Sequence, residues 1–236
     1  MRYLLTGLFG FIMTVSASAQ QPAASPSAAS PEVLAAKPVI SMQEPLVGDY
    51  WTYEIRDLIT GQISETTTVV ITDVTPTEVS VRSSAQGSVQ RADRDVIAVY
   101  DRLWNMKSAG VWKHSPNDGL GIKSSLLVGA TWTFKSDDIG TSERGTSHFK
   151  RTGSSKTVGQ EKITTKAGTF DTFKIETTYS TQRTDDPGTK NETTIQTWYA
   201  PAINRWVKRV RTSRTNKLLR TNTTNELVDY GRKGQP

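Results

Sequence analysis

Apolar and polar residues alternate with a period of two through most of the chain after residue 45. In the segment YWTYEIRD, Trp51, Tyr53 and Ile55 fall on one face of an extended strand, while Thr52 and Glu54 fall on the other. This alternation is typical of a β-strand buried on one face. Turns such as DDPG separate further segments of the same kind. The sequence therefore predicts an all-β fold: a large, curved antiparallel sheet in the form of a half-barrel or open barrel.

One motif occurs twice, each time at the start of a predicted strand. LVGDYWTY begins at Leu46 and LVGATWTF begins at Leu127. We expect Gly to permit a tight turn in each copy and Trp to enter the sheet pointing inward. The repeat divides the predicted β domain, residues 46–231, into possible halves 46–126 and 127–231, and residues 232–236 form a short tail.

The aromatic residues of this repeat have two interpretations. Trp51 and Tyr53 share one face of their strand, as Trp132 and Phe134 do in the second copy. The four rings could form a platform for a ligand, or they could be matching parts of the hydrophobic core. Inward aromatic side chains are more often core than binding surface, so the pattern favours the second interpretation.

The N-terminal residues have the layout of a secretory signal peptide. Arg2 precedes an apolar run that ends at Val15, and small residues follow up to Ala19. The run is shorter than the roughly 20 residues that span a bilayer, so we predict cleavage after Ala19 rather than a membrane anchor. Residues 20–45, rich in Ala, Ser and Pro, are predicted to form a disordered linker. We expect a periplasmic or secreted protein.

Composition limits the chemistry that this chain can perform. It has no cysteine, which excludes disulfides, thiol catalysis, cysteine metal sites and a lipid-anchored cysteine. Its stability must then come from burial, for which six Trp, seven Tyr and six Phe are available. The net charge of +6 favours association with anionic surfaces such as lipopolysaccharide, phospholipid or cell-wall polymers.

The two histidines lack the spacing of a metal or catalytic site. His114 lies in a loop-like run four residues before Asp118, and no second ligand follows at helical spacing. Ser147 and His148 are adjacent in a predicted strand, so their side chains point to opposite faces and cannot pair. We expect His114 to be a solvated loop residue.

Acidic pairs could serve glycoside hydrolysis if they faced a cleft. Asp137-Asp138 and Asp185-Asp186, however, are predicted to lie in turns, where Asp is usually structural. We therefore predict no catalytic residues, no metal, no cofactor and no enzymatic activity. A hydrolase that uses His114 or these pairs is the third alternative.

One strongly basic segment, RWVKRVRTSRTNKLLR, covers residues 205–220 and contains no acidic residue. Its alternation predicts a strand. It could bind an anionic glycan or lipid head group, or it could be a solvated edge hairpin whose charges prevent aggregation. The second interpretation is the more common one. The candidate residues for anionic-surface binding are Arg205, Lys208, Arg209, Arg211 and Arg214.

The C-terminal third resembles a family of bacterial envelope proteins of unassigned function, the TapB-like group, which is related to domains of unknown function. The resemblance rests on AGTF at 167–170, WYAP at 198–201, Val207-Lys208 and the Glu-Leu-x-x-Tyr pattern at 226–230. VGDYWTYEI near the start also matches. The resemblance implies a half-barrel similar to bacterial lipoprotein carriers and no catalytic residues. One departure is residues 202–205, where family members often have a Gly-containing turn.

These observations favour an exported, non-enzymatic binding or accessory protein for an apolar or lipid-like ligand. Trp51, Tyr53, Trp132 and Phe134 are its candidate ligand-binding residues, provided that the concave face is open. The alternative is an interaction protein that docks on an anionic envelope polymer or a protein partner through residues 205–220. Neither nucleic acid nor a membrane-spanning segment is expected.

Overall fold

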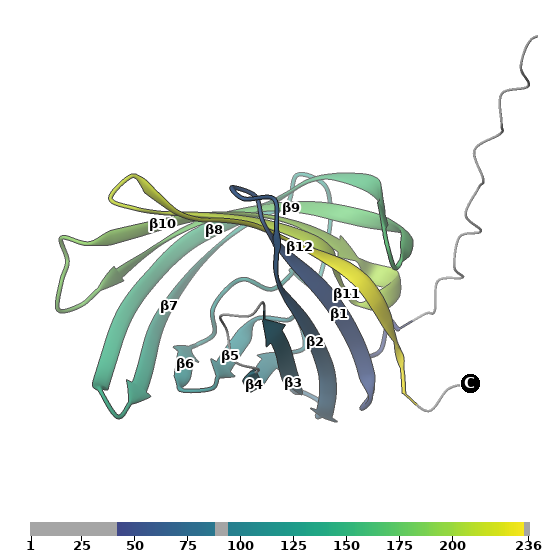
Figure 1. Ribbon diagram of the computed structural model, residues 1–236, viewed down its shortest axis with the longest axis horizontal. Helices are drawn as coiled ribbons and strands as arrows, with labels where there is room; N and C mark the ends of the chain where they lie inside the picture. The colour runs from purple at the N-terminus through teal and green to yellow at the C-terminus, as the bar shows by residue number, and fades with distance from the viewer. Residues whose placement is uncertain (1–41, 88–93, 234–236) are drawn as a thin grey trace, which may run out of the picture. The chain divides into compact units, whose positions relative to one another are not determined.

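The strands follow one another around a closed β-barrel in the computed structural model, which describes residues 42–87 and 94–233 (Figure 1). Each strand is antiparallel to its two neighbours, and β1 pairs with β12 to close the sheet. The described strands are β1 (Asp49–Asp57), β2 (Ile63–Val74), β3 (Glu78–Gly87), β4 (Arg94–Asp101), β5 (Met106–Ala109), β6 (Trp112–Ser115), β7 (Thr131–Ser142), β8 (Gly145–Thr165), β9 (Gly168–Arg183), β10 (Lys190–Ala200), β11 (Arg205–Thr215) and β12 (Leu218–Arg232). A short 3-10 helix, η1 (Pro201–Ile203), joins β10 to β11.

The predicted all-β antiparallel class is confirmed, and the sheet closes completely. Closure depends on pairs such as Trp51 with Tyr230, which join the first strand to the last. Alternation along single strands carries no information about pairs so distant in sequence. The expected signal peptide and residues 20–41 of the expected linker lie outside the described residues. Among those that the structure does describe, no helix is long and apolar enough to cross a membrane.

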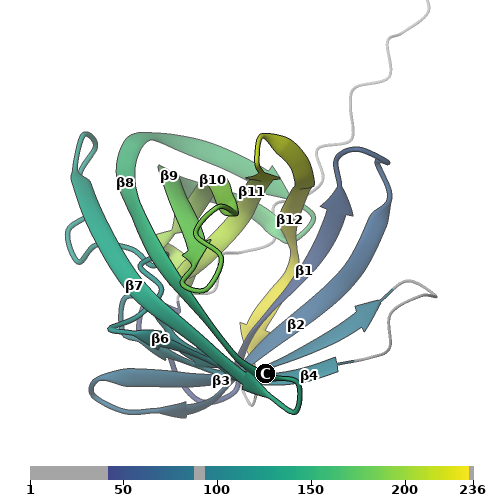
Figure 2. The ribbon, with the colours of Figure 1, turned by 90° about the vertical axis from the view of Figure 1, so that its left-hand side faces the viewer.

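The barrel has two different ends. At the mouth, which faces the viewer in Figure 2, the strands are joined by tight turns. These turns are made by residues 58–62, 110–111, 143–144, 184–189 and 216–217. At the base, the connections are residues 75–77, 102–105, 116–130, 166–167 and 201–204.

The repeated Leu-Val-Gly motif forms the same tight turn twice at the base. In residues 46–49 and again in residues 127–130, the first carbonyl accepts a hydrogen bond from the fourth N–H, at 3.1 and 3.0 Å. Gly48 and Gly129 occupy the third position with φ of 92° and 90°, a conformation that glycine adopts without steric cost. The motif is therefore a turn signal, and its Leu and Val side chains are exposed.

Each of these turns is attached to a neighbouring strand before its own strand begins. The glycine N–H of the first copy donates to Ile71 of β2 at 2.9 Å, and that of the second copy donates to Thr157 of β8 at 2.8 Å. The chain then places Trp51 and Trp132 on the inner face of the barrel. In both copies, the turn and the glycine hydrogen bond thus lead the chain into its strand in the same way.

The base of the barrel is filled by an aromatic core around Arg205. Trp104 makes edge-to-face contacts with Trp51 and Tyr100, at centroid distances of 5.8 and 5.6 Å. The guanidinium carbon of Arg205 lies 3.9 Å from the ring centroid of Trp104 and 3.7 Å from that of Trp206. Arg205 is 1% exposed, and its Nε and Nη1 have no hydrogen-bond partner in the described part of the chain. Ring faces therefore stabilise this cation in place of a carboxylate.

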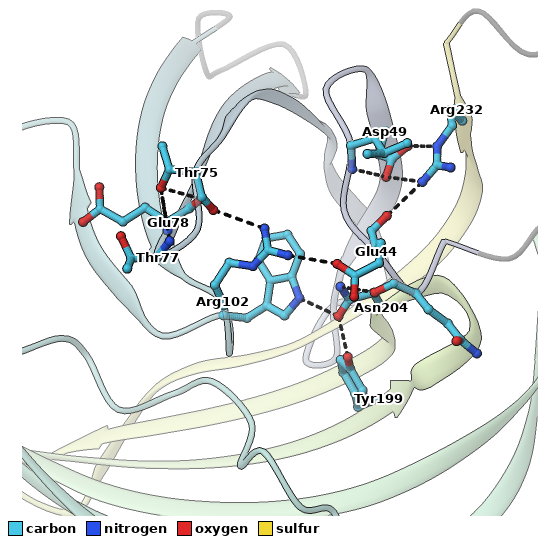
Figure 3. Close-up of polar contacts among 12 residues, drawn as sticks. Glu44, Asp49, Thr75, Thr77, Glu78, Arg102, Tyr199, Asn204 and Arg232 are labelled. Atoms are coloured by element: carbon cyan, nitrogen blue, oxygen red, sulfur yellow. Dashed lines mark hydrogen bonds and ion pairs between the residues drawn. The ribbon is translucent and has the colours of Figure 1, made fainter.

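The chain before β1 packs against the base (Figure 3). Met42 is 1% exposed, and its N–H donates to the carbonyl of Ala202 at 2.7 Å. Glu44 forms an ion pair with Arg102 at 3.0 Å, while its carbonyl accepts a hydrogen bond from Arg232. The contacts of the barrel therefore extend back to Met42, within the segment expected to be a linker.

Asn204 organises the connection between β10 and β11. It has a φ of 48°, and asparagine is among the few residues other than glycine that tolerate this left-handed conformation. Its Oδ1 accepts hydrogen bonds from Tyr199 and Trp104, and its Nδ2 donates to the carbonyl of Gln43 (Figure 3). Asparagine thus occupies the left-handed position of this turn and joins it to β10 and to the chain before β1.

The connection between β6 and β7, residues 116–130, folds into the barrel, and we call it the inner loop. The N–H of Asp118 donates to the carbonyl of Met106, and the N–H of Ile122 donates to that of Leu103, both at 2.8 Å. Ile122 packs against the aromatic core. The inner loop therefore separates the filled base from the space below the mouth.

Candidate ligand-binding site

A cavity of about 400 Å³ lies between the inner loop and the mouth. Strands β5 to β11 and the inner loop supply its wall, which combines aromatic, aliphatic and charged side chains. The lining residues are Met106, Ala109, Trp112, His114, Asp118, Leu120, Asp138, Phe149, Arg151, Tyr179, Thr181, Asn191 and Arg211. Small-molecule sites are typically apolar clefts of this size with a few polar groups that fix orientation.

Titratable side chains from three neighbouring strands and the inner loop meet in this cavity. Nδ1 of His114 lies 2.8 Å from Oδ1 of Asp138, and Nη2 of Arg151 lies 2.7 Å from Oδ2 of the same carboxylate. The hydroxyl of Ser136 also donates to Asp138, at 2.7 Å. On the inner loop, Oδ2 of Asp118 lies 3.9 Å from Nη1 of Arg151. Arg151 thus lies between two carboxylates.

The two carboxyl groups of this cluster have pKa values shifted in opposite directions. Burial raises the pKa of Asp118 above its ordinary value of 3.8, and its backbone hydrogen bonds and the charge of Arg151 offset this only partly. Burial also acts to raise the pKa of Asp138, but the hydrogen bond with His114 and the charge of Arg151 lower it below 3.8. Opposed shifts in one cavity are characteristic of functional sites.

Aromatic side chains form the rest of the cavity wall. Trp112 packs on Phe149 with a centroid distance of 5.8 Å. The guanidinium carbon of Arg151 lies 5.1 Å from the ring centroid of Tyr179, whose hydroxyl accepts a hydrogen bond from Nη2 of Arg211 at 3.1 Å. The wall therefore offers both ring faces and a guanidinium group to a bound molecule.

The four predicted ligand-binding aromatics lie inside the barrel at different depths. Trp51 and Tyr53 are 0% and 3% exposed, and the base core covers them. Trp132 is partly buried against the same core. Phe134 lies nearer to the cavity, with its centroid 6.4 Å from that of Tyr179. Their role in ligand binding stays a prediction, and the cavity wall itself consists of other residues.

The five basic residues predicted to bind an anionic surface are also dispersed. Arg205 and Arg209 point into the barrel, where both stack on Trp206, and Arg211 lines the cavity. In a regular strand, Trp206 would point to the opposite face from Arg205 and Arg209. The pairing of β10 with β11 shifts by one residue next to Trp206, so this alternation of faces is interrupted there. On the outer face, Nζ of Lys208 lies 3.6 Å from Oε2 of Glu226. Arg211 and Arg214 are exposed, and surface binding by this strand stays a prediction.

Two expectations about polar residues are wrong. His114 is not a solvated loop residue: it belongs to β6, and its side chain is 8% exposed. Asp137 and Asp138 are not in a turn, because they pair within β7 with residues of β6 and β8. Asp185 does lie in a turn, between β9 and β10. Long-range strand pairing creates the cluster, and the short His114–Asp118 spacing was the one local signal of it.

The geometry of the cluster does not form a nucleophile–base pair. The hydroxyl of Ser136 donates to Asp138 rather than to His114, so Ser136 is not aligned for activation by the imidazole. Within residues 42–87 and 94–233, no group of three or more His, Asp or Glu side chains is arranged to hold a metal ion. The arrangement suits the binding of a ligand with both polar and apolar parts.

A larger hollow of about 680 Å³ lies elsewhere, over β8, β9 and η1. Lys162 and Asp171, two of its charged side chains, form an exposed ion pair at 2.6 Å. Such a pair is a common feature of a solvated surface. The cavity at the mouth, with its buried charges, is therefore the better candidate site.

Comparisons with known proteins show similarity to proteins of unassigned function. A family model described as DUF3108-like matches residues 143–222. No protein with a curated description matches the chain. The comparisons do not confirm the TapB-like group in particular.

Three solved structures resemble this one at low sequence identity. The first is a candidate lipoprotein from Parabacteroides distasonis, 13% identical, with a TM-score of 0.55 over 81% of this chain and 99% of that chain. A candidate exported protein with a YmcC-like fold from Bacteroides fragilis is 12% identical, with a TM-score of 0.45 over 82% and 100%. The hypothetical lipoprotein YmcC from Escherichia coli is 11% identical, with a TM-score of 0.45 over 79% and 85%. The chain thus shares its fold with the first of these proteins and resembles the DUF3108-like family over residues 143–222.

Proposed function

We propose that this protein is a non-enzymatic binding protein of the cell envelope and that it holds a single-chain anionic amphiphile in the cavity at the mouth. The observation that carries the proposal is the cavity itself, about 400 Å³ in volume, with ring faces and buried charges in one wall. The predicted signal peptide supports the envelope location.

The apolar part of the ligand would lie against Trp112, Phe149, Met106 and Leu120, all of which line the cavity. Burial of hydrocarbon is worth about 0.8 kcal/mol per methylene group. Affinity should therefore rise about fourfold with each added methylene until the cavity is full. This site differs from the predicted platform, because Trp51 and Tyr53 are already covered by protein.

Arg211 is the group that selects an anionic head group. Arg151 is already paired with Asp138, whereas the hydrogen bond that Arg211 makes goes to the uncharged hydroxyl of Tyr179. Arg211 has no ion-pair partner among the described residues, and its remaining N–H groups can donate to a carboxylate. Guanidinium groups bind carboxylates through paired, charge-assisted hydrogen bonds.

Calorimetric titration with decanoate and with decanol tests this assignment. A hydrogen bond to a charged group is worth about 1.5–3 kcal/mol. Arg211→Gln should therefore weaken decanoate binding by roughly 10- to 100-fold and leave decanol binding nearly unchanged. Arg214→Gln, an exposed arginine on the same strand, is the matched control and should change neither. Equal losses for both ligands would contradict the role of Arg211.

A cavity-filling variant tests the location. Ala109 lines the cavity, whereas Val111, two residues away, is 54% exposed in the turn that follows. Ala109→Trp should abolish binding of both amphiphiles, and Val111→Trp should preserve it. Both variants need an unfolding transition like that of the unmodified protein. Full binding by a folded Ala109→Trp protein would place the ligand elsewhere.

A further inference from the structure

The rim of the mouth combines exposed apolar residues with a cluster of cations. At the tip of the β11–β12 hairpin, Leu218 and Leu219 are 62% and 44% exposed. At the β1–β2 turn, Leu58 and Ile59 are 42% and 64% exposed. Large apolar side chains gathered at one edge of a soluble surface mark an interaction site.

These two hairpins are neighbours. The N–H of Leu58 donates to the carbonyl of Asn222 at 2.8 Å, which ties the β1–β2 turn to β12. Both tips lie on the side of the barrel that Figure 2 presents to the viewer. Their exposed apolar side chains therefore lie on adjacent hairpins of the rim, and we call these four residues the rim patch (Leu58, Ile59, Leu218 and Leu219).

The charge around the rim patch is positive. Arg214, Lys217 and Arg220 surround the β11–β12 tip, all three are exposed, and residues 205–220 contain no acidic residue. The nearest acidic residue of the β1–β2 turn, Asp57, accepts hydrogen bonds from the N–H groups of Ile59 and Thr60. On β10, Glu192 lies opposite Arg214 and forms an ion pair with Lys190 at 2.9 Å. Cations therefore outnumber acidic groups around the β11–β12 tip.

We propose that the rim patch docks on an anionic phospholipid bilayer, with the leucine and isoleucine side chains in the interface and the three cations on the lipid head groups. Apolar insertion and attraction of basic residues to anionic lipids together suffice for reversible binding at a membrane surface. The proposal deepens the proposed function and rests on it for its purpose, because docking would turn the mouth of the cavity toward a source of amphiphiles.

Sedimentation with vesicles tests this surface. The full chain should bind vesicles that contain phosphatidylglycerol, should bind pure phosphatidylcholine far less, and should be released by salt. Each removed cation should lower the partition coefficient roughly fivefold. The triple variant Arg214→Gln, Lys217→Gln, Arg220→Gln should therefore bind roughly 100-fold more weakly.

The base of the barrel supplies a matched control for the apolar part. Leu127 and Val128 are 66% and 57% exposed at the second Leu-Val-Gly turn. Leu218→Ser with Leu219→Ser should lower vesicle binding at least tenfold, and Leu127→Ser with Val128→Ser should leave it unchanged. Equal effects of the two pairs, or no binding of the unmodified protein to phosphatidylglycerol, would overturn the proposal. Retention on an anionic polysaccharide without vesicle binding would also overturn it, in favour of a cell-wall polymer.

Failure of docking and failure of ligand binding are distinguishable. Decanoate titration in solution does not involve vesicles, so the rim variants should bind decanoate as the unmodified protein does. Ala109→Trp should have the reverse profile, with vesicle binding kept and decanoate binding lost.

Discussion

Asp49 and Arg232 join the first strand of the barrel to the last through two hydrogen bonds. Nε of Arg232 donates to Oδ1 of Asp49 at 2.6 Å, and Nη2 donates to Oδ2 at 3.0 Å. Asp49 is 0% exposed, and it also accepts the N–H of Leu46 (Figure 3). A buried, fully bonded carboxylate thus lies where the sheet closes.

Loss of this charge should weaken the closure of the barrel. Removing one partner of a buried pair costs about 3–5 kcal/mol, and less where the other partner reaches solvent, as Arg232 does in part. Asp49→Asn should lower the unfolding free energy by about 2–3 kcal/mol in urea denaturation. Asp171→Asn, in the exposed pair with Lys162, is the control and should cost under about 1 kcal/mol. Similar values for the two variants would contradict a structural role for the pair.

The second Leu-Val-Gly turn should depend on its glycine through backbone conformation alone. A Cβ at Gly129 would have no atom within 4 Å, yet the residue has a φ of 90°. Gly129→Ala should therefore destabilise the fold by about 1–2 kcal/mol without any steric clash. Gly159 has equal space and no positive φ, so Gly159→Ala should be neutral or slightly stabilising. Identical urea midpoints for Gly129→Ala and Gly159→Ala would contradict the need for glycine in this turn.

The two carboxyl groups of the cavity should give opposite pH dependence. The pKa of Asp138 is lowered in the folded state. Its ionised form therefore stabilises the fold above pH 3.8, and this stabilisation is lost as the pH falls through the pKa of the folded state. The pKa of Asp118 is raised, so its charging destabilises the fold as the pH rises above 3.8. Relative to the unmodified protein, Asp138→Asn should lose stability and Asp118→Asn should gain it on going from pH 3 to pH 7. Urea unfolding over that range measures both differences, and parallel curves would contradict the opposed shifts.

Local pattern was sufficient to predict the strands and several turns. Trp51 and Tyr53 are buried on the face that alternation assigned to them, and the DDPG turn separates β9 from β10. These features depend on residues close in sequence, for which a period of two and turn chemistry are direct signals.

The candidate site depends on contacts that no local pattern contains. His114, Asp138 and Arg151 meet because β6, β7 and β8 pair side by side. The Asp137-Asp138 pair had the composition of a turn, but within a strand Asp138 forms an ion pair with Arg151 and a hydrogen bond with His114. The inner loop brings Asp118 to the same place through hydrogen bonds to β5.

Native mass spectrometry of the protein purified from its own cell envelope tests the central claim most directly. We expect a bound single-chain amphiphile of one negative charge on the unmodified protein, retained by Val111→Trp and missing from a folded Ala109→Trp variant. An unmodified protein that carries no ligand and binds neither decanoate nor decanol in solution would contradict it.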